Sequence, residues 1–475
     1  MTEKHLRHFF NCTVPIYDCN LRCRYCFVTQ AHLAEGRKTV RLDADLLAQA
    51  LSLKRAGLSM VNLCGHGETL LHPDIVPVVR ELLAAGQFVA VVTNCSVTKR
   101  VEELCSLPMS MRERLFLKAS FHYEELRRLK MLDRYFENIS RLRQAGISYS
   151  IEVVASDSLA PLVPEMISLF RERGEALPQV LDSRESTSGD IDRLTELGIS
   201  EHTALWSQFH SPLFDGMQAL WGVRRKEFCY AGEYSVAVNL ASGEMIQCSE
   251  RRALQNIYQD LEEPLHFLAV GRNCPLSHCY ISYVWQGLCG NIRGLCFPSY
   301  DSQRNRILPD GSEWLLPVVK QAYSEVIGHE AGYYSSRKEH IVSALMDAQY
   351  RGMEAVCAED RTALEDWLEE LFPSGSRIVI YGMGRIGQLV AGLLTNIQGR
   401  ELLAVADRNK PCDVEAGGWQ WLSPREALGE RLADLGTTEV LVTPFIDGLS
   451  VARRFREHHP VVRTIVLLTA LRDLK

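Results

Sequence analysis

The stretch that decides the fold is Ile16–Phe27, which reads "IYDCNLRCRYCF". It places Cys19, Cys23 and Cys26 within eight residues, with the aromatic Tyr25 directly before the third cysteine. A ferredoxin-type [4Fe–4S] cluster takes four cysteine thiolates. A motif that provides three leaves one iron open to another ligand. We therefore predict an iron–sulfur cluster with one open iron near the start of the chain.

The totals describe a globular protein of several domains. The chain has 475 residues, of which 46% are hydrophobic and 23% charged, and its formal net charge is −7. The chain does not have the excess of basic residues that would indicate a nucleic-acid partner. The amino-terminal residues lack the apolar segment of a signal peptide, and no apolar run predicts a membrane span. We expect a cytoplasmic protein whose 15 cysteines serve as metal ligands rather than as disulfides.

The first 200 or so residues alternate strand-like with helix-like segments, which is typical of βα units and a parallel sheet. The amphipathic segments 74–86 and 135–146 each end in a glycine, as many helices do. Chemistry in such folds gathers at the carboxyl ends of the strands. The apolar runs that predict strands are 58–65, 87–94, 114–121, 148–155 and 178–182.

The CxxxCxxC spacing with its preceding aromatic resembles the signature of the radical S-adenosylmethionine (radical SAM) superfamily. The resemblance covers about residues 10–215 and implies a partial (β/α)₆ TIM-type barrel. It also implies that the open iron binds SAM and that an electron from the cluster yields a 5′-deoxyadenosyl radical. A zinc knuckle completed by Cys12 or His32 is the alternative, although zinc hooks usually come in pairs.

Later segments resemble further motifs of the family in the same order. "CGHGETLLHPD" (64–74) resembles its glycine-rich GGEP-type motif, with His66 and Thr69 in place of the usual glycine and proline. "VVTNCS" (91–96) and "KASFH" (118–122) resemble the ends of its third and fourth strands. Glycine lets the backbone approach a ligand closely. The residues expected to bind SAM are Gly65, Gly67, Glu68, Asn94 and Ser120.

A second group of cysteines begins with "CYAGEYSVAVNLASGEMIQC" (229–248), which predicts a β-hairpin around Gly243. It resembles the entry to the SPASM and twitch domains of radical SAM enzymes, which hold auxiliary iron–sulfur clusters. Only six cysteines lie in this region, so the one-cluster twitch form fits better. We expect Cys229, Cys248, Cys274 and Cys279 to bind a second [4Fe–4S] cluster, with Cys289 or Cys296 as possible replacements for one of the last two.

The carboxyl-terminal part contains "RIVIYGMGRIGQLVAGLL", a GxGxxG sequence between a predicted strand and a predicted helix. A second predicted strand ends at Asp407. This context is typical of a Rossmann-type nucleotide-binding unit, in which the helix start favours a phosphate. The candidate nucleotide-binding residues are Gly382, Gly384, Gly387 and Asp407.

The predicted architecture is α/β with four parts. Residues 1–215 form the radical SAM partial barrel, 216–300 the twitch or SPASM-like domain, 301–372 a helical connector and 373–475 a Rossmann-like domain.

We predict an enzyme that cleaves SAM and abstracts hydrogen from a small molecule, most plausibly a sugar or nucleotide-linked sugar, with dehydrogenation as the outcome. It would need a reducing partner such as flavodoxin or ferredoxin. Epimerisation is the nearest alternative, with Cys95 or Cys64 as the hydrogen donor. Two others stay open: modification of a ribosomal peptide, and a metal-stabilised protein that senses a nucleotide without catalysis.

Overall fold

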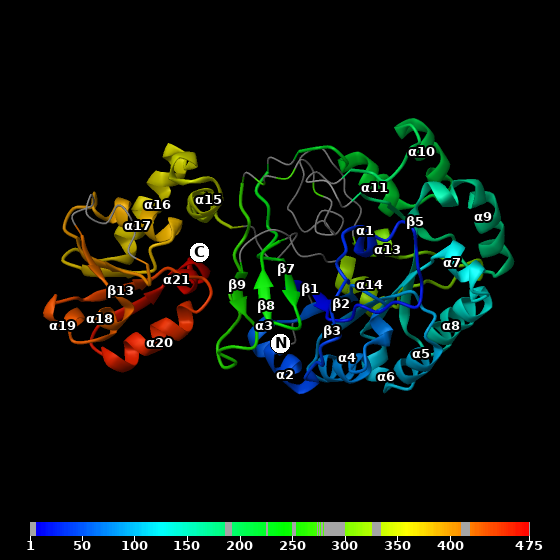
Figure 1. Cartoon of the computed structure of the whole chain (residues 1–475), viewed down its shortest axis with the longest axis horizontal. Helices are drawn as coiled ribbons and strands as arrows, with labels where there is room; N and C mark the ends of the chain where they lie inside the picture. Colours follow the sequence, from blue (N-terminus) through cyan, green and yellow to red (C-terminus); the bar gives the residue numbers. More distant parts are fainter. Residues whose placement is uncertain are drawn as a thin grey trace.

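The structure is a computed structural model of the whole chain, and Figure 1 shows its arrangement. It describes residues 6–185, 192–224, 227–248, 253–272, 274, 276, 279, 300–324, 334–409 and 419–474. The candidate ligands Cys289 and Cys296 lie outside the described residues.

A nine-stranded sheet forms the larger part of the molecule. The first six strands are parallel and β7 pairs in parallel with β1, whereas β8 and β9 are antiparallel. In the order of the sheet the strands are β6 (Gln179–Asp182), β5 (Ser148–Ala155), β4 (Leu115–Ser120), β3 (Phe88–Thr93), β2 (Ser59–Gly65), β1 (His8–Val14), β7 (Ser235–Asn239), β8 (Glu244–Ile246) and β9 (Ala253–Asn256).

The strands confirm most of the sequence prediction. The five predicted runs are β2 to β6, and the predicted hairpin is β7 and β8 with Gly243 in its turn at φ +76°. The prediction missed β1. Its buried residues are interrupted by polar residues that face the interior of the barrel. It also missed that the hairpin continues the barrel sheet through the β1–β7 ladder.

The helices between the first strands cover the outer face of this sheet (Figure 1). The predicted segment 74–86 contains α4, whose buried residues Ile75, Val78, Val79, Leu82 and Leu83 follow the spacing of one helix face. Segment 135–146 overlaps α8, and both helices end near the predicted glycine. The helices here are α2 (Ala44–Ala50), α3 (Leu53–Ala56), α4 (Ile75–Ala84), α5 (Thr98–Cys105), α6 (Met109–Arg112), α7 (Tyr123–Arg128), α8 (Leu132–Gln144) and α9 (Val163–Glu172).

Shorter elements connect and cap these units. The helices α10 (Ile199–Trp206) and α11 (Pro212–Leu220) follow β6. The 3-10 turns are η1 (Thr69–Leu71), η2 (Asp157–Leu162), η3 (Ser207–Phe209) and η4 (Met353–Ala355).

The inner face of the sheet is covered by residues 300–324, which include α13 (Tyr300–Arg304) and α14 (Pro317–Ser324). The Tyr300 ring packs against Phe9 of β1, and the Tyr323 ring against Phe116 of β4. The backbone N–H of Leu316 donates to Ser148 Oγ of β5 at 2.9 Å. This half of the predicted connector is therefore part of the barrel.

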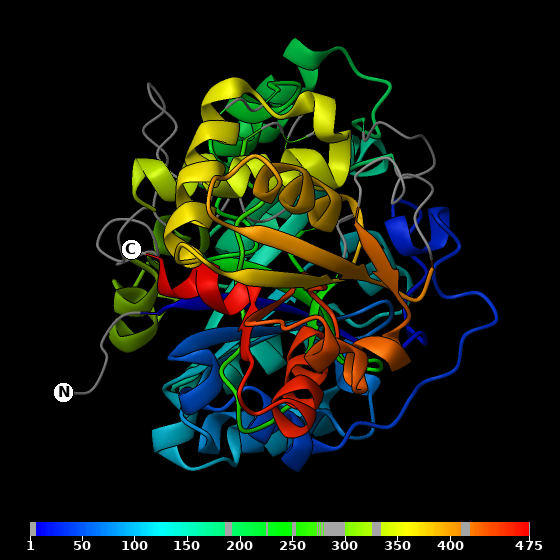
Figure 2. The ribbon, with the colours of Figure 1, turned by 90° about the vertical axis from the view of Figure 1, so that its left-hand side faces the viewer.

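The other half of the connector, α15 (Ser336–Arg351) and α16 (Ala358–Leu371), packs beside the second sheet. That sheet is parallel, and Figure 2 shows it with helices on both faces. Its order is β12 (Gln420–Leu422), β11 (Glu401–Ala406), β10 (Arg377–Tyr381), β13 (Glu439–Val442) and β14 (Arg463–Val466). Its helices are α17 (Arg385–Leu394), α18 (Pro424–Leu428), α19 (Arg431–Asp434), α20 (Gly448–His458) and α21 (Leu467–Asp473).

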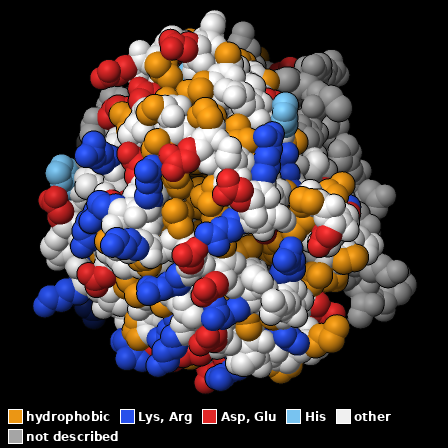
Figure 3. Space-filling model, turned by 90° about the vertical axis from the view of Figure 1, so that its right-hand side faces the viewer, with side chains coloured by type: hydrophobic (Ala, Val, Ile, Leu, Met, Phe, Trp, Pro, Cys, Tyr) orange, Lys and Arg blue, Asp and Glu red, His pale blue; other side chains and the backbone are white. Residues whose placement is uncertain are grey.

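The surface shows no single sign of charge over the outer helices of the barrel. On that face acidic and basic side chains alternate, with hydrophobic side chains between them (Figure 3). Among the helices in the described part of the chain, none combines the length and the apolar character that a membrane span requires.

A buried arginine ties the barrel to the segment that follows β9. The Arg55 guanidinium of α3 donates to the carbonyl oxygens of Ile257 and Glu263, both at 2.8 Å, and of Ala50 at 2.9 Å. Arg55 is 4% exposed, and burial lowers the pKa of its guanidinium. Loss of this side chain would leave several buried carbonyls without donors.

We expect Arg55→Ala to lower the free energy of unfolding by about 2–4 kcal/mol, because each orphaned buried carbonyl costs about 1–3 kcal/mol. Urea denaturation of the purified chain measures it. Arg80→Ala is the control, since the Arg80 side chain is 53% exposed, and we expect a change within about 0.5 kcal/mol. Equal changes in the two variants would contradict a structural role for Arg55.

Candidate functional site

The three cysteines of the opening motif lie in the loop between β1 and α1 (Phe27–Gln30), at the carboxyl ends of the parallel strands. Cys26 is the N-cap residue of α1. All three thiols are partly buried. We call residues 15–26 the cysteine loop.

The thiols of the cysteine loop lie close enough to influence one another electrostatically. Burial raises the pKa of Cys23 to about 12, and the neighbouring Cys19 and Cys26 act in the same direction. Burial likewise raises the pKa of Cys19. Three thiolates in one partly buried loop repel one another and are poorly solvated. They are therefore stable only beside a positive charge, such as that of a metal cluster.

The glycine turn after β2 holds the cysteine loop by direct backbone contact. The N–H of Glu68 donates to the carbonyl of Asp18 at 2.9 Å. A Cβ on Gly67 would lie 2.1 Å from that same Asp18 oxygen, and a Cβ on Gly65 would lie 2.3 Å from Ile16 Cγ2. Only glycine at these positions lets the two backbones approach so closely.

The loop after β3 holds the cysteine loop through amide side chains. Asn94 Nδ2 donates to Asn20 Oδ1 at 2.8 Å, and Asn20 Nδ2 donates to Ser96 Oγ at 2.8 Å. Ser96 Oγ in turn donates to Asn94 Oδ1 at 2.6 Å. Asn20 lies between the first two cysteines, so this ring of hydrogen bonds sets the position of the motif.

Residues after β4 provide the third support. The N–H of Arg22 donates to Glu125 Oε2 at 2.7 Å, and the Tyr25 hydroxyl lies 2.8 Å from His122 Nδ1. Burial lowers the pKa of His122 to about 4, so the imidazole is neutral at physiological pH. The aromatic residue before the third cysteine is thus fixed by a hydrogen bond as well as by packing.

Glu68 lies in a buried network of hydrogen bonds, and its binding of SAM remains a prediction. Its carboxylate is 3% exposed and accepts hydrogen bonds from Thr93 Oγ1 at 2.5 Å and from the N–H groups of Asn94 and Leu70 at 2.7 and 2.9 Å. Burial raises the pKa of Glu68, and these hydrogen bonds oppose the rise. The contacts show that Glu68 joins the glycine turn to the end of β3.

The other candidate residues differ in where their side chains lie. Ser120 and Cys64 are partly exposed at the ends of β4 and β2. Burial raises the pKa of the Cys64 thiol, and Lys118 acts in the opposite direction. Cys95 is fully buried in the hydrophobic core, with a backbone φ of +56°. Of the two proposed hydrogen donors, Cys64 alone lies on the inner face of the sheet.

Comparison with known families agrees with this arrangement. Residues 13–156 match the family described as the radical SAM superfamily. The chain contains a radical SAM domain. Among curated protein sequences, none matches the chain.

Several solved structures are similar to this chain at low identity. SuiB of Streptococcus suis, bound to S-adenosylmethionine, is 16% identical with a TM-score of 0.40, covering 57% of this chain and 67% of its own. The anSMEcpe structure with bound AdoMet and Cp18Cys peptide is 14% identical with a TM-score of 0.40, covering 53% and 77%. Methylornithine synthase (PylB) is 13% identical with a TM-score of 0.29, covering 43% and 63%.

The donor set of the cysteine loop fits the cluster that a radical SAM domain implies. Three thiols share one partly buried loop, and in an iron–sulfur cluster each thiolate binds its own iron. The two residues considered for the fourth ligand of a zinc knuckle lie in different surroundings. Cys12 is 1% exposed within β1, and the His32 side chain is 71% exposed and bonded to Glu35. In the described part of the chain, no three His, Cys, Asp or Glu side chains surround a single metal ion.

The hairpin cysteines lie beside the radical SAM domain. Cys229 pairs with Gly271 through two backbone hydrogen bonds, of 2.9 and 3.0 Å, so the segment after β9 returns to the start of the hairpin. The thiols of Cys229, Cys248, Cys274 and Cys279 are all partly buried. A second cluster held by these four residues remains a prediction.

The glycine turn of the second sheet brings its backbone segments into close contact. Gly382 has φ +101°, and a Cβ on Gly387 would lie 1.9 Å from the Gly382 carbonyl oxygen. Around Gly384 the space is open. Asp407 accepts the N–H of Met383 at 2.6 Å, so its carboxylate supports the turn from within. Nucleotide binding here remains a prediction.

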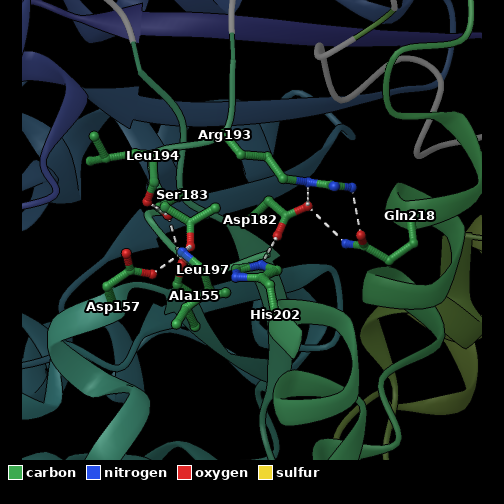
Figure 4. Close-up of polar contacts among 10 residues, drawn as sticks. Ala155, Asp157, Asp182, Ser183, Arg193, Leu194, Leu197, His202 and Gln218 are labelled. Atoms are coloured by element: carbon green, nitrogen blue, oxygen red, sulfur yellow. Dashed lines mark hydrogen bonds and ion pairs between the residues drawn. The ribbon is translucent and has the colours of Figure 1, made fainter. Parts of the chain in front are cut away.

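Sequence reasoning missed a polar cluster at the carboxyl end of β6 (Figure 4). Asp182 accepts from His202 Nε2 and Gln218 Nε2, both at 2.8 Å, and from Arg193 Nε at 3.2 Å. Ser183 Oγ lies 2.6 Å from the Ala155 carbonyl. The signal available was an aspartate that ends a buried strand. The cluster fixes the chain after β6, where the Arg184 guanidinium lies 4.7 Å from the centre of the Phe27 ring.

We expect Gly67→Ala to lose iron from the cysteine loop, because the added methyl group would displace Asp18 and the cysteines beside it. Iron and sulfide per chain, measured after anaerobic reconstitution, test this. The loss should equal that of a Cys19/Cys23/Cys26→Ala variant. Gly198→Ala is the matched control, since a Cβ there meets nothing within 4 Å. Normal iron in Gly67→Ala would contradict the proposed contact.

Proposed function

We propose that this protein is a radical SAM enzyme that abstracts a hydrogen atom from a small-molecule substrate. The observation that carries the proposal is the support of the three-thiol loop by the glycine turn and by the ends of β3 and β4. Function at the carboxyl ends of parallel strands is the rule for barrels of this kind. When bound, the cluster supplies the electron that splits SAM into methionine and a 5′-deoxyadenosyl radical.

The residues of the chain divide the work of binding and positioning. Cys19, Cys23 and Cys26 hold the cluster. The Gly65–Gly67 backbone lies directly against the cysteine loop and lets the cosubstrate approach closely. Ser120 at the end of β4 contacts the SAM carboxylate, as the family resemblance implies. Glu68 accepts hydrogen bonds from Thr93 and Asn94 and so fixes the glycine turn to the end of β3.

The substrate we propose is a sugar or a nucleotide-linked sugar, and the reaction a dehydrogenation. After hydrogen abstraction the substrate radical loses a proton and a second electron. Cys229, Cys248, Cys274 and Cys279 would hold a second cluster, which when bound would supply an acceptor for that electron. The glycine turn at Gly382–Gly387 supports recognition of a nucleotide by the second sheet.

The decisive test is the formation of 5′-deoxyadenosine from SAM under anaerobic conditions with dithionite. We expect reconstituted wild-type protein to form it and Cys23→Ala to reduce it to background, because the cluster loses one of three ligands. Cys357→Ala is the control, since this thiol is exposed and far along the chain from the motif. Absence of 5′-deoxyadenosine from the wild type would favour the non-catalytic nucleotide sensor.

Epimerisation is the second candidate, favoured by the position of Cys64 on the inner face of the sheet. An epimerase would return a hydrogen atom from this thiol to the substrate radical, and solvent deuterium would enter the product. We expect Cys64→Ala to abolish such incorporation and Cys95→Ala to retain it, because Cys95 is buried in the core. Mass spectrometry of the product formed in D₂O measures this. A product without solvent deuterium would support dehydrogenation.

A further inference from the structure

The inner face of the large sheet carries polar side chains in its middle layer. Alternation along the strands places Asn11, Asn62, Lys118, Ser150 and Glu152 on this one face. Phe9 and Phe116, which are two residues earlier on β1 and β4, pack against α13 and α14 on the same side. These polar side chains therefore share the inner face with that apolar packing, and Lys118 lies two residues nearer the carboxyl end of β4 than Phe116.

Among these inner-face residues, Lys118 carries a charge that has the least compensation from neighbouring groups. It is 8% exposed, and within the described residues its ammonium group makes no hydrogen bond. Its charge lowers the pKa of Cys64 on β2 and of Glu152 on β5. An ammonium group that has no acceptor in the protein is available to pair with an anionic group of a ligand.

The carboxylate of Glu152, on which the charge of Lys118 acts, is already paired with another residue. Glu152 forms a buried ion pair with Arg304 of α13, and the two side chains are 7% and 3% exposed. The group of Lys118, Arg304 and Glu152 thus carries two positive charges and one negative charge. Arg304 Nε and Asn62 Oδ1 are buried without a hydrogen-bond partner among the described residues. These observations indicate that a ligand supplies the polar group that pairs with these side chains.

The position of Lys118 separates this site from the expected site of the SAM carboxylate. Ser120 lies at the end of β4, and Lys118 lies two residues earlier on the same face. Two residues of a strand correspond to about 6.6 Å. An anion bound by Lys118 would therefore lie deeper in the barrel than the amino-acid part of SAM, where a substrate would face the cosubstrate.

We propose that Lys118 is a specificity-determining residue that binds an anionic group, a carboxylate or a phosphate, of the substrate. This inference rests on the proposed radical SAM function and narrows its substrate class. A sugar acid, a sugar phosphate or the diphosphate of a nucleotide-linked sugar has the required charge. A neutral sugar would leave the ammonium group unpaired.

The test uses radiolabelled inorganic phosphate as the probe, in equilibrium dialysis against anaerobic protein loaded with its clusters and SAM. We expect one site in the wild type that acetate displaces. Lys118→Met should weaken phosphate binding about tenfold or more, because a charge-assisted hydrogen bond is lost. Lys118→Arg should retain binding. Lys99→Met, at an exposed position on α5, should leave it unchanged.

Three results would overturn the proposal: no phosphate binding by the wild type, equal binding by Lys118→Met, or a loss of SAM affinity in Lys118→Met. The last result would assign Lys118 to the cosubstrate instead. Iron content confirms that each variant is folded and loaded, and Lys118→Arg gives a second reading if Lys118→Met is unstable. 5′-Deoxyadenosine formation is measured in parallel. If it is absent while phosphate binding depends on Lys118, the radical chemistry fails and the anion site stands.

Discussion

The site depends on the contact between the cysteine loop and the glycine turn after β2. One backbone hydrogen bond, from Glu68 to Asp18, joins two segments that are far apart in the sequence, and the absence of a side chain at Gly67 makes their approach possible. The hydrogen bonds among the side chains of Asn20, Asn94 and Ser96 then fix the loop to the end of β3. A short loop with three thiols has little structure of its own, so its shape comes from the ends of the neighbouring strands.

The same sheet has to meet opposite demands on its two faces. The outer face packs helices against aliphatic side chains, whereas the inner face changes from aromatic to polar along the strands. The aromatic layer is completed by α13 and α14, which come from a distant part of the sequence. The charged side chains of Glu152 and Arg304 are buried together, and such pairs are kept where position matters more than stability.

Much of the fold could be predicted because its strands are continuous apolar runs, as in β2 to β5. β1 was missed because Asn11 and Thr13 face the interior of the barrel and interrupt its pattern. The radical SAM domain was found because the cysteine spacing, the aromatic Tyr25 and the later glycine-rich motif together resemble the pattern of the family. The burial of Cys95 could not be predicted in this way, because the sequence does not distinguish a cysteine in the core from a cysteine in an active site. The supports of the cysteine loop also escaped prediction, because hydrogen bonds between distant loops leave no periodic signal.

The position of β1 between β2 and β7 has a consequence for biosynthesis. β1 is the strand that leads into the cysteine loop, yet its second neighbour begins at residue 235. During translation one edge of β1 therefore stays open until about half of the polypeptide has left the ribosome, and an open edge invites pairing with other chains. A nascent chain that received its iron before this point would do so on an unfinished sheet. The first strand is thus completed only by a ladder that joins it to the middle of the chain.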